Sequence, residues 1–279
     1  MKIKDLQRHV FSQLQPEFGK GEARVFTDML LQYYTGYNRI ALNLYPQTEI
    51  SDIAVNQIYT AIIELLAHKP IQYILGETEF CGLKFKVNSS VLIPRPETEE
   101  LVMWIEKENP QAKTILDLCT GSGCIAIALA NQLKNTALAG IDISLDALSV
   151  AKENAKLNQV QVDFLQADVL HPHFSMEKKW DVIVSNPPYV RENERKQMSI
   201  RVLDYEPPLA LFVDDDNPLL FYKAIARIGA NHLTENGKLY LEINEAYGNE
   251  IKALLQQYNY KDIVLKKDIH GKDRMICGS

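Results

Sequence analysis

The sequence predicts an α/β protein built on a doubly wound, mostly parallel seven-stranded sheet, with a small N-terminal helical bundle joined to it by a β-hairpin. After about residue 90, apolar strand-like runs alternate with helix-like segments, which is the order that builds a parallel sheet. The first of these strands, Thr114–Leu118, leads into a glycine turn and a helix. Before residue 70, apolar residues recur at helical spacing instead.

The composition is that of a globular chain, because 46% of its 279 residues are hydrophobic and 24% are charged. No apolar run approaches the ~20 residues of a membrane span, and the N-terminus lacks the apolar core of a signal peptide. We therefore expect a cytoplasmic protein with no membrane partner. The net charge of −6 argues against tight nonspecific binding to nucleic acid, which needs a basic surface. The four cysteines show no metal-type spacing, and we expect no metal.

Residues 1–75 are expected to form a helical domain. Three sets of apolar residues recur at intervals of three or four, as on one face of a helix. No catalytic constellation is visible in this segment, so it either adds stability or docks a partner. The three sets are Ile3, Leu6, Val10 and Leu14; Phe26, Met29, Leu30 and Tyr33; and Ile58, Ile62, Leu65 and Leu66.

Residues 76–92 are expected to form a linker, because the chain there alternates around Gly82 in the manner of a β-hairpin. The domain that follows, residues 93–279, opens with a proline, an acidic turn and an apolar-periodic run, which is a typical helix start. Arg95 and Glu97 lie at this start. They either mark the beginning of the helix or form a wall of the site.

A turn that suits a nucleotide-like cofactor follows the first strand of the sheet. Glycines let the backbone approach a ligand closely, and the N-terminus of the next helix offers free N–H groups. The third glycine of the dehydrogenase fingerprint is missing, so the pattern is a different one. The predicted cofactor contacts in this block are Asp117 in the strand and Cys119, Thr120, Gly121, Ser122 and Gly123 in the turn.

Two further acids end the next two predicted strands. Asp142 follows the second strand, where a carboxylate can accept hydrogen bonds from both ribose hydroxyls; the alternative is that it caps the following helix. Asp168 follows a third strand at 160–165 and can reach an adenine amino group, with Val169 packed on the ring. The alternative for Asp168 is an ordinary turn residue.

The stretch Asn186-Pro187-Pro188-Tyr189 comes directly after a buried strand, Trp180–Ser185. Its prolines fix two φ angles and remove two N–H donors. The Asn186 side-chain oxygen and the Pro187 carbonyl are then acceptors without competing donors, beside the Tyr189 ring. Such a pocket suits a flat NH2 group. The alternative is a proline-stiffened turn.

The rest of the chain completes the predicted sheet. Residues 190–216 form a long, charge-rich stretch that is either functional or a solvated excursion. A strand at 238–243 and a helix then lead to two closely spaced strands, 262–267 and 274–277. Their short connection predicts an antiparallel edge.

Taken together, these motifs resemble those of the class I S-adenosylmethionine-dependent methyltransferases. The NPPY stretch resembles the subgroup that methylates planar nitrogens, namely the amino groups of adenine or cytosine and the side-chain amide of glutamine. The residues that carry the resemblance are Asp117, Gly121, Ser122, Gly123, Asp142, Asp168, Asn186, Pro187, Pro188 and Tyr189.

The chain also resembles, over nearly its whole length, the release-factor glutamine N5-methyltransferase family. That resemblance implies S-adenosylmethionine as methyl donor, S-adenosylhomocysteine as product, and the glutamine of the Gly-Gly-Gln motif of a peptide chain release factor as acceptor. It further implies that the N-terminal helical domain contacts the release factor. Cys119 departs from the family, which usually has glycine there. The matching stretches are PIQYILG at 70–76, Glu79-Phe80, VLIPRPETE at 91–99 and Tyr205-Glu206-Pro207.

The site residues fall into three groups on this interpretation. An amide nitrogen is a poor nucleophile because its lone pair is delocalised, so the acceptors at Asn186 and Pro187 are expected to hold it in line with the methyl group. The cofactor group comprises Asp117, the five turn residues, Asp142, Asp168, Val169 and Asn186. The catalytic group is Asn186, Pro187 and Tyr189, and the substrate group is Asn186, Pro187, Pro188, Tyr189, Arg95 and Glu97.

Two other functions stay open. An amino-methyltransferase acting on adenine or cytosine in RNA or DNA would use the same NPPY chemistry and predicts a basic face. A module that binds the cofactor without catalysis is a second alternative, against which the intact acceptor stretch argues.

Overall fold

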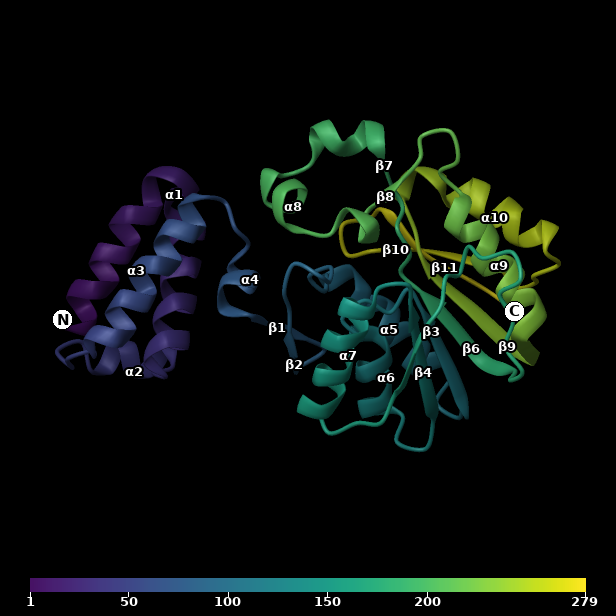
Figure 1. Ribbon diagram of the computed structural model, residues 1–279, viewed down its shortest axis with the longest axis horizontal. Helices are drawn as coiled ribbons and strands as arrows, with labels where there is room; N and C mark the ends of the chain where they lie inside the picture. Colours follow the sequence, from purple (N-terminus) through teal and green to yellow (C-terminus); the bar gives the residue numbers. More distant parts are fainter. The chain divides into compact units, whose positions relative to one another are not determined.

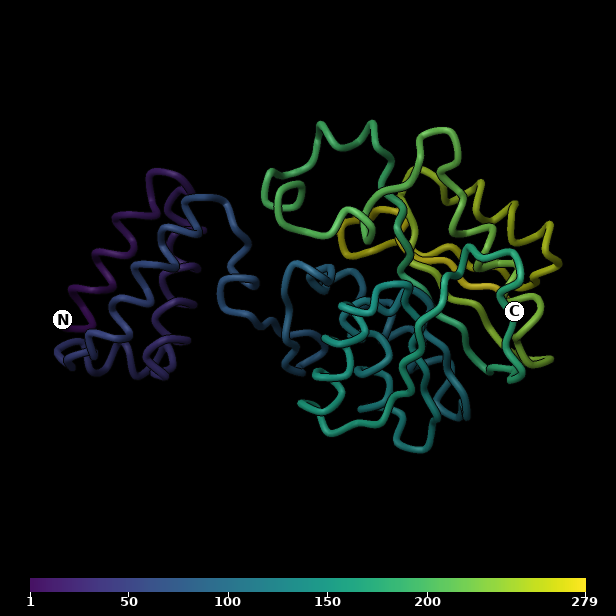
Figure 2. Tube along the Cα trace, viewed as in Figure 1, coloured from purple at the N-terminus to yellow at the C-terminus, as the bar shows by residue number.

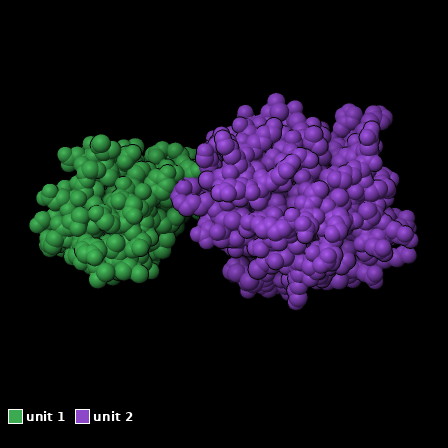
Figure 3. All heavy atoms as spheres, turned by 90° about the horizontal axis from the view of Figure 1, so that it is seen from below, with its two compact units in different colours: residues 1–76, 199–205 green, residues 77–198, 206–279 purple.

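The computed structural model describes the whole chain, residues 1–279, which divides into two compact units (Figure 3). The first unit contains residues 1–76 and 199–205, and the second contains residues 77–198 and 206–279. The smaller piece of the first unit comes from the stretch that follows the NPPY sequence. None of the helices is long and apolar enough to cross a membrane.

The first unit is built from helices whose apolar faces meet in one core, in which Ile3 and Leu14 are fully buried. The longest helix is interrupted at Gly19, where φ is 70° and ψ is 173°, so it consists of two helical pieces. Tyr33 and Leu66 belong to the predicted apolar sets, but they are 44% and 40% exposed and face solvent. The helices are α1 (Ile3–Thr35), α2 (Arg39–Leu44), α3 (Asp52–Leu66) and α4 (Ile71–Leu75).

A short helix from far along the chain, α8 (Ile200–Tyr205), completes this unit. The Arg201 guanidinium donates to both carboxylate oxygens of Glu22, at 2.6 and 3.1 Å. The Tyr205 hydroxyl donates to the Ala67 carbonyl at 2.7 Å. The bidentate Arg201–Glu22 ion pair and the Tyr205 hydrogen bond therefore hold α8 against the other helices of this unit.

The stretch 190–216, predicted as one long loop, contains several short elements of its own. Its two strands pair in parallel. Two acids of the acidic run serve as local acceptors, because Asp215 accepts from the Asn193 amide at 3.1 Å and Asp214 from the Asp216 amide at 3.0 Å. Besides α8, the elements are β7 (Val190–Arg191), η1 (Glu192–Gln197), η2 (Pro208–Ala210) and β8 (Phe212–Val213).

The second unit opens with an antiparallel hairpin made of β1 (Glu77–Phe80) and β2 (Leu83–Lys86). The two turn residues, Cys81 and Gly82, have φ angles of 51° and 72°, as a tight hairpin turn with left-handed residues requires. Phe80 and Phe85 are buried and meet edge to face, with ring centroids 5.9 Å apart. The hairpin thus contributes apolar side chains to the core of the second unit.

A seven-stranded sheet of order β10-β11-β9-β6-β3-β4-β5 forms the centre of the second unit (Figure 1). Neighbouring strands from β9 to β5 are parallel, whereas β11 runs antiparallel to both β9 and β10. The predicted fold class and the predicted antiparallel edge are both confirmed. The strands are β3 (Thr114–Leu118), β4 (Ala137–Asp142), β5 (Asp163–Gln166), β6 (Trp180–Ser185), β9 (Leu233–Glu242), β10 (Val264–Lys267) and β11 (Asp273–Gly278).

Helices cover both faces of the sheet, as Figure 1 shows. Successive strand residues point to opposite faces, so Ile115 packs with α5 and α6 while its neighbour Leu116 packs with α9 and α10. The two apolar clusters on either side of the sheet make a three-layer unit. The covering helices are α5 (Pro96–Glu108), α6 (Cys124–Gln132) and α7 (Leu145–Leu157) on one face, and α9 (Leu220–His232) and α10 (Gly248–Gln257) on the other.

The order of the strands reverses next to β3. The Cα trace (Figure 2) runs from β3 outward through β4 and β5, and the next strand, β6, lies on the other side of β3. Because the crossover connections diverge there, a crevice opens at the carboxyl ends of β3 and β6. The glycine turn after β3 and the NPPY stretch after β6 therefore meet at one edge of the sheet.

Candidate active site

A cavity of about 390 Å³ lies at this edge, within the size range of small-molecule sites. The carboxyl ends of β3, β4, β5 and β6, the start of α5 and the segment after α8 all contribute to its wall. The lining residues are 89–92, Pro94, Arg95, Thr98, 119–122, Cys124, Ile125, 142–144, Asp146, Ala147, 167–170, Asn186, Pro188, Pro207, Leu209, Ala210 and Phe221.

The turn between β3 and α6 brings main chain to the cavity. Cys119, Gly121 and Gly123 have φ angles of 60°, 55° and 78°, all in the left-handed region. Glycine adopts this conformation without strain, which gives a physical reason why glycine is usual at the position where this chain has Cys119. Cys119 and Gly121 line the cavity, but Gly123 does not. A Cβ on Gly123 would lie 3.0 Å from Ile127 Cδ1, so this glycine permits close packing behind the turn.

Asp117 lies beneath the turn and not in the cavity wall. It is fully buried, and the Thr120 hydroxyl donates to its Oδ2 at 2.6 Å. Its Oδ1 is buried without a hydrogen-bond partner. Burial raises the pKa of this carboxyl to about 7, against the opposing effect of the Thr120 hydrogen bond. Thr120 does line the cavity, so the geometry gives Asp117 the task of holding Thr120 and the turn.

Asp142, at the end of β4, hydrogen-bonds to the backbone of the glycine turn. Its Oδ2 accepts from the Gly121 amide at 2.8 Å, and its Oδ1 accepts from the Ser144 amide at 2.9 Å. The alternative role as helix cap is excluded, because Ser144 is the N-cap of α7 and accepts from the Ala147 amide through its own hydroxyl. Burial raises the pKa of Asp142, although these backbone donors oppose the shift. The carboxylate lies in the cavity wall, and each oxygen keeps a lone pair for a ligand hydroxyl.

Asp168 and Val169 also line the cavity, at the end of β5. Asp168 Oδ1 accepts from the Leu170 amide at 2.8 Å, so this residue shapes its own turn. Val169 is buried at 5% exposure and belongs to the apolar cluster under the site. The turn role and the predicted ligand role are thus compatible, because one carboxylate can serve both.

The NPPY stretch presents only part of itself to the cavity. Asn186 and Pro188 line it, whereas Pro187 and Tyr189 do not. The Asn186 Nδ2 donates to Thr98 Oγ1 at 3.3 Å. The Tyr189 hydroxyl donates to Glu242 Oε1 at 3.0 Å, so its polar end points to the sheet. Burial and the Glu242 charge raise the pKa of this phenol.

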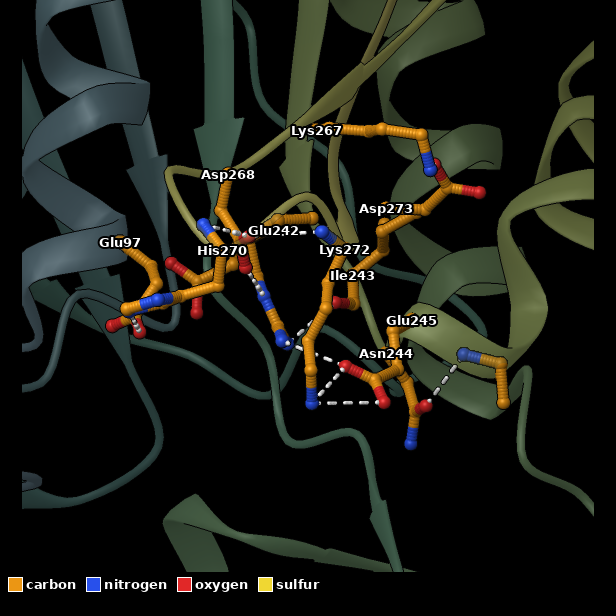
Figure 4. Close-up of polar contacts among 12 residues, drawn as sticks. Glu97, Glu242, Ile243, Asn244, Glu245, Lys267, Asp268, His270, Lys272 and Asp273 are labelled. Atoms are coloured by element: carbon orange, nitrogen blue, oxygen red, sulfur yellow. Dashed lines mark hydrogen bonds and ion pairs between the residues drawn. The ribbon is translucent and has the colours of Figure 1, made fainter.

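Arg95 and Glu97, predicted together as a wall, are separated by the structure. Arg95 lines the cavity and donates through Nη2 to Glu206 Oε1 at 2.6 Å. Glu206 is only 3% exposed and also accepts from the Ile93 amide at 3.3 Å. Glu97 does not line the cavity, and its Oε1 lies 3.9 Å from His270 Nε2 (Figure 4).

Three polar residues around the site were missed from the sequence: Thr98, Glu206 and Glu242. Thr98 lies one turn into the helix that was predicted to start after Arg95. Glu242 ends an otherwise apolar strand, β9, and a carboxylate at the end of a buried parallel strand is the same signal that identified Asp142. The buried Glu206 lies in the matching stretch Tyr205-Glu206-Pro207, but the resemblance assigned no role to its side chain.

Comparisons with known proteins identify the class of protein. Residues 5–76 match the model of the PrmC N-terminal domain, and residues 96–204 match that of the Methyltransferase small domain. The solved structure of a Methyltransferase from Pyrococcus furiosus shares the fold at a TM-score of 0.51 and 17% identity, covering 71% of this chain and 88% of the other. Fold and cavity together define a class I methyltransferase, whose methyl donor is S-adenosylmethionine.

Sequence relatives narrow this class to one family. A "Release factor glutamine methyltransferase" of Flavobacterium psychrophilum is 46% identical over 99% of this chain and 98% of the relative. One of the same name from Bacteroides thetaiotaomicron is 47% identical over 86% and 87%. The chain belongs to the release factor glutamine methyltransferase family, as its sequence motifs predict.

Proposed function

We propose that this protein transfers a methyl group from S-adenosylmethionine to the side-chain amide nitrogen (N5) of the glutamine in the Gly-Gly-Gln motif of peptide chain release factors, and so modulates translation termination. The observation that carries the proposal is that Asn186, Asp142 and the glycine turn line one cavity. A site for a nucleoside and an acceptor for a flat NH2 group thus lie together in a chain of this family.

The residues of the cavity fit the methyl donor. The Asp142 carboxylate suits the ribose hydroxyls, and Asp168 with Val169 suits the adenine ring and its amino group. The left-handed turn brings main chain, without side-chain bulk at Gly121, to the wall. When bound, S-adenosylmethionine supplies an electrophilic methyl group and leaves as S-adenosylhomocysteine.

Asn186 and Pro187 act on the other reactant. The glutamine nitrogen carries two hydrogens, and the Asn186 Oδ1 and the Pro187 carbonyl each accept one. This holds the nitrogen in place for in-line attack. Both acceptors bind more strongly as positive charge develops on the nitrogen, which stabilises the transition state. The N–C bond forms as the C–S bond of the donor breaks, and the nitrogen then releases one proton to solvent.

The decisive experiment is mass spectrometry of release factor incubated with this protein and S-adenosylmethionine. We expect one added methyl group, located by fragmentation on the glutamine of the Gly-Gly-Gln motif. A release factor with that glutamine replaced by alanine is the matched control and should gain nothing. Methylation of RNA or DNA with an unmodified release factor would instead favour an amino-methyltransferase of nucleic acid.

We further propose that residues 1–75 dock the release factor and that residues 93–279 carry most of the chemistry. Residues 76–92 join the two, as a hairpin packed in the core of the second unit and a segment whose residues 89–92 line the cavity. A second grip on a protein substrate adds affinity through effective concentration. The helical unit carries exposed apolar residues suited to such a grip: Ile40 is 69% and Leu44 is 66% exposed on α2.

The docking role is tested without removing the helical unit. Its deletion would also remove Glu22 and Ala67, the hydrogen-bond partners of Arg201 and Tyr205. The double variant Ile40→Asp/Leu44→Asp should raise KM for intact release factor about tenfold or more. Its activity on a short Gly-Gly-Gln peptide should stay within about twofold. Ile269→Asp, at a position 71% exposed in the second unit, is the matched control. If the double variant impairs methylation of the peptide and of intact release factor equally, the helical unit does not dock the substrate and serves stability instead.

A further inference from the structure

A chain of buried hydrogen bonds runs from the acceptor residue back into the sheet. Asn186 Nδ2 donates to Thr98 Oγ1 at 3.3 Å, and the Thr98 hydroxyl donates to Glu242 Oε2 at 2.6 Å. The other carboxylate oxygen, Oε1, accepts from the Tyr189 hydroxyl at 3.0 Å. Thr98 and Glu242 are 2% and 1% exposed, so water does not compete for these bonds. Three separate elements, α5, β9 and the segment after β6, contribute to the chain.

The chemistry of each group sets the direction of every bond in this chain. An ionised carboxylate only accepts hydrogen bonds, and a hydroxyl has a single proton to give. The Thr98 proton is given to Glu242, which leaves only lone pairs on Thr98 for Asn186. Asn186 must therefore present its NH2 group to Thr98, because its oxygen would meet another acceptor. A planar amide turned in this way directs its oxygen to the opposite side.

The two carboxylate oxygens of Glu242 accept from the Thr98 and Tyr189 hydroxyls and not from the nearby Arg274. The nearby guanidinium of Arg274 donates to Asp268 Oδ2 at 3.1 Å, to the Ile243 carbonyl at 3.3 Å and to Glu245 Oε2 at 3.3 Å. Figure 4 shows Glu242 beside the Asp268 and His270 loop and next to the Ile243, Asn244 and Glu245 segment. Arg274 thus supplies positive charge near the carboxylate, while its hydrogen bonds go elsewhere.

We propose that Glu242 is a positioning residue: through the Thr98 hydroxyl it fixes the rotation of the Asn186 amide, so that the Asn186 oxygen faces the cavity as an acceptor for the substrate NH2 group. Tyr189 supports the same carboxylate from the NPPY stretch itself. This inference rests on the proposed function, because it assigns the acceptor that the amide nitrogen of glutamine requires. An asparagine amide free to turn would offer its own NH2 to the substrate half of the time, and two donors would then face each other.

Three single variants test the inference through the rate of methyl transfer in a single turnover. Thr98→Val removes the hydroxyl at nearly constant volume, and Glu242→Gln replaces one acceptor by a donor. Both should lower the rate by about 10- to 100-fold, as loss of one preorganised polar group does elsewhere. Thr98→Ser keeps the hydroxyl and should retain the rate within about threefold. The dissociation constant for S-adenosylmethionine should change less than about threefold in all of them.

Tyr240→Phe is the matched control for loss of a buried hydroxyl. Tyr240 lies on the same strand and face as Glu242, is fully buried, and bonds through its hydroxyl to Glu108 and Asn109, each at 2.9 Å. Its removal should cost stability comparable to Thr98→Val while leaving the rate within about twofold. If Tyr240→Phe slows transfer as much as Thr98→Val, the Thr98 effect is merely structural and the inference fails.

A double-mutant cycle shows whether Thr98 acts through Asn186. In the Asn186→Ala background, Thr98→Val should lower the remaining rate by less than about twofold, because there is no amide left to orient. An equal loss in both backgrounds would overturn the inference.

A second readout does not depend on activity and reports directly on the Asn186 NH2 group. In nuclear magnetic resonance of the free protein, the Asn186 side-chain NH2 signal is identified by its absence in Asn186→Ala. It should exchange slowly with solvent in the wild type and in Thr98→Ser, and at least about tenfold faster in Thr98→Val and Glu242→Gln. Unchanged exchange in both variants would contradict the orientation. If the Asn186 NH2 exchanges slowly in the wild type and faster in Thr98→Val, but release factor is not methylated, the proposed function is wrong and the orientation of Asn186 still holds.

Discussion

The two ends of the cavity are built in different ways. The cofactor end is made mainly of main chain, a left-handed turn held by the Asp142 carboxylate within one strand–turn–helix unit. The acceptor end depends on side chains from three elements far apart in the sequence, with Asn186 oriented by Thr98 and Thr98 by Glu242. A site for a cofactor common to a whole class is thus encoded locally. The group that selects the acceptor depends on tertiary packing.

Buried carboxyls also differ between the two ends. Asp117, under the turn, has one hydroxyl donor and one oxygen without a partner. Glu242, behind the acceptor, has a hydroxyl donor on each oxygen and a guanidinium nearby. Burial raises the pKa of both groups, and hydrogen-bond donors oppose the shift at each of them. The orientation proposed for Asn186 requires Glu242 as a carboxylate, which its two hydroxyl donors and the nearby guanidinium favour.

The largest effect is expected at the acceptor end. Asn186→Ala should lower the single-turnover rate of methyl transfer by about 10²-fold or more, because one preorganised acceptor of the transition state is lost. The affinity for S-adenosylmethionine, measured by calorimetry, should change much less. A variant that keeps near wild-type speed would remove Asn186 from the chemistry.

The converse pattern is expected at the cofactor end. Asp142→Ala removes charge-assisted hydrogen bonds to the ribose, so the affinity for S-adenosylmethionine should fall by about 1.5–3 kcal/mol, or roughly 10- to 150-fold. The rate at saturating cofactor should fall far less. Calorimetry of the folded variant checks the first statement, and unchanged affinity would mean that Asp142 only braces the turn.

Asp117 makes stability depend on pH. Its folded pKa of about 7 lies above the ordinary value of 3.8, so its stabilising contribution is fully present below pH 3.8 and is lost as pH rises through 7. The Asp117→Asn variant lacks this titration. Between pH 5 and 8, its free energy of unfolding relative to wild type should therefore rise by roughly 2 kcal/mol. Urea unfolding at several pH values measures the difference, and two parallel pH curves would contradict the shifted pKa.

The smallest effect is expected at Glu97, beside the acceptor end but outside the cavity. Glu97→Gln should leave both kcat and KM within about threefold, because the carboxylate faces the exposed His270 side chain and surface ion pairs contribute little. Steady-state kinetics with intact release factor decides the matter. A large rise in KM would show that the substrate reaches beyond the cavity.

Several residues that the sequence singles out at strand ends, Asp142, Asp168 and Asn186, lie in the cavity wall. Asp142 and Asp168 were found because a carboxylate at the end of a parallel strand must lie at the edge where ligands bind. Asn186 was found because two prolines after a buried strand leave acceptors and no donors. The antiparallel edge followed from the short link before β11.

Two predicted site residues make contacts that their motifs do not indicate. Tyr189 was expected beside the acceptors and Glu97 in the wall of the site, yet the direction of a side chain depends on what lies across the fold. Tyr189 turns to Glu242, 53 positions away, and Glu97 faces His270. The assignment of residues 199–205 to a helical unit likewise depends on the Arg201 contact with Glu22, 179 positions away.

The sequence by itself determined the class of fold and located the glycine turn and the proposed acceptor residue, because periodicity, glycine conformation and proline geometry act over a few neighbouring residues. Only the tertiary structure decided which way the Asn186 amide points. That orientation depends on one proton of Thr98 and on the carboxylate of Glu242, 144 positions further along the chain. The sheet places β9 next to β6 and α5 against β9, and so brings all three side chains together.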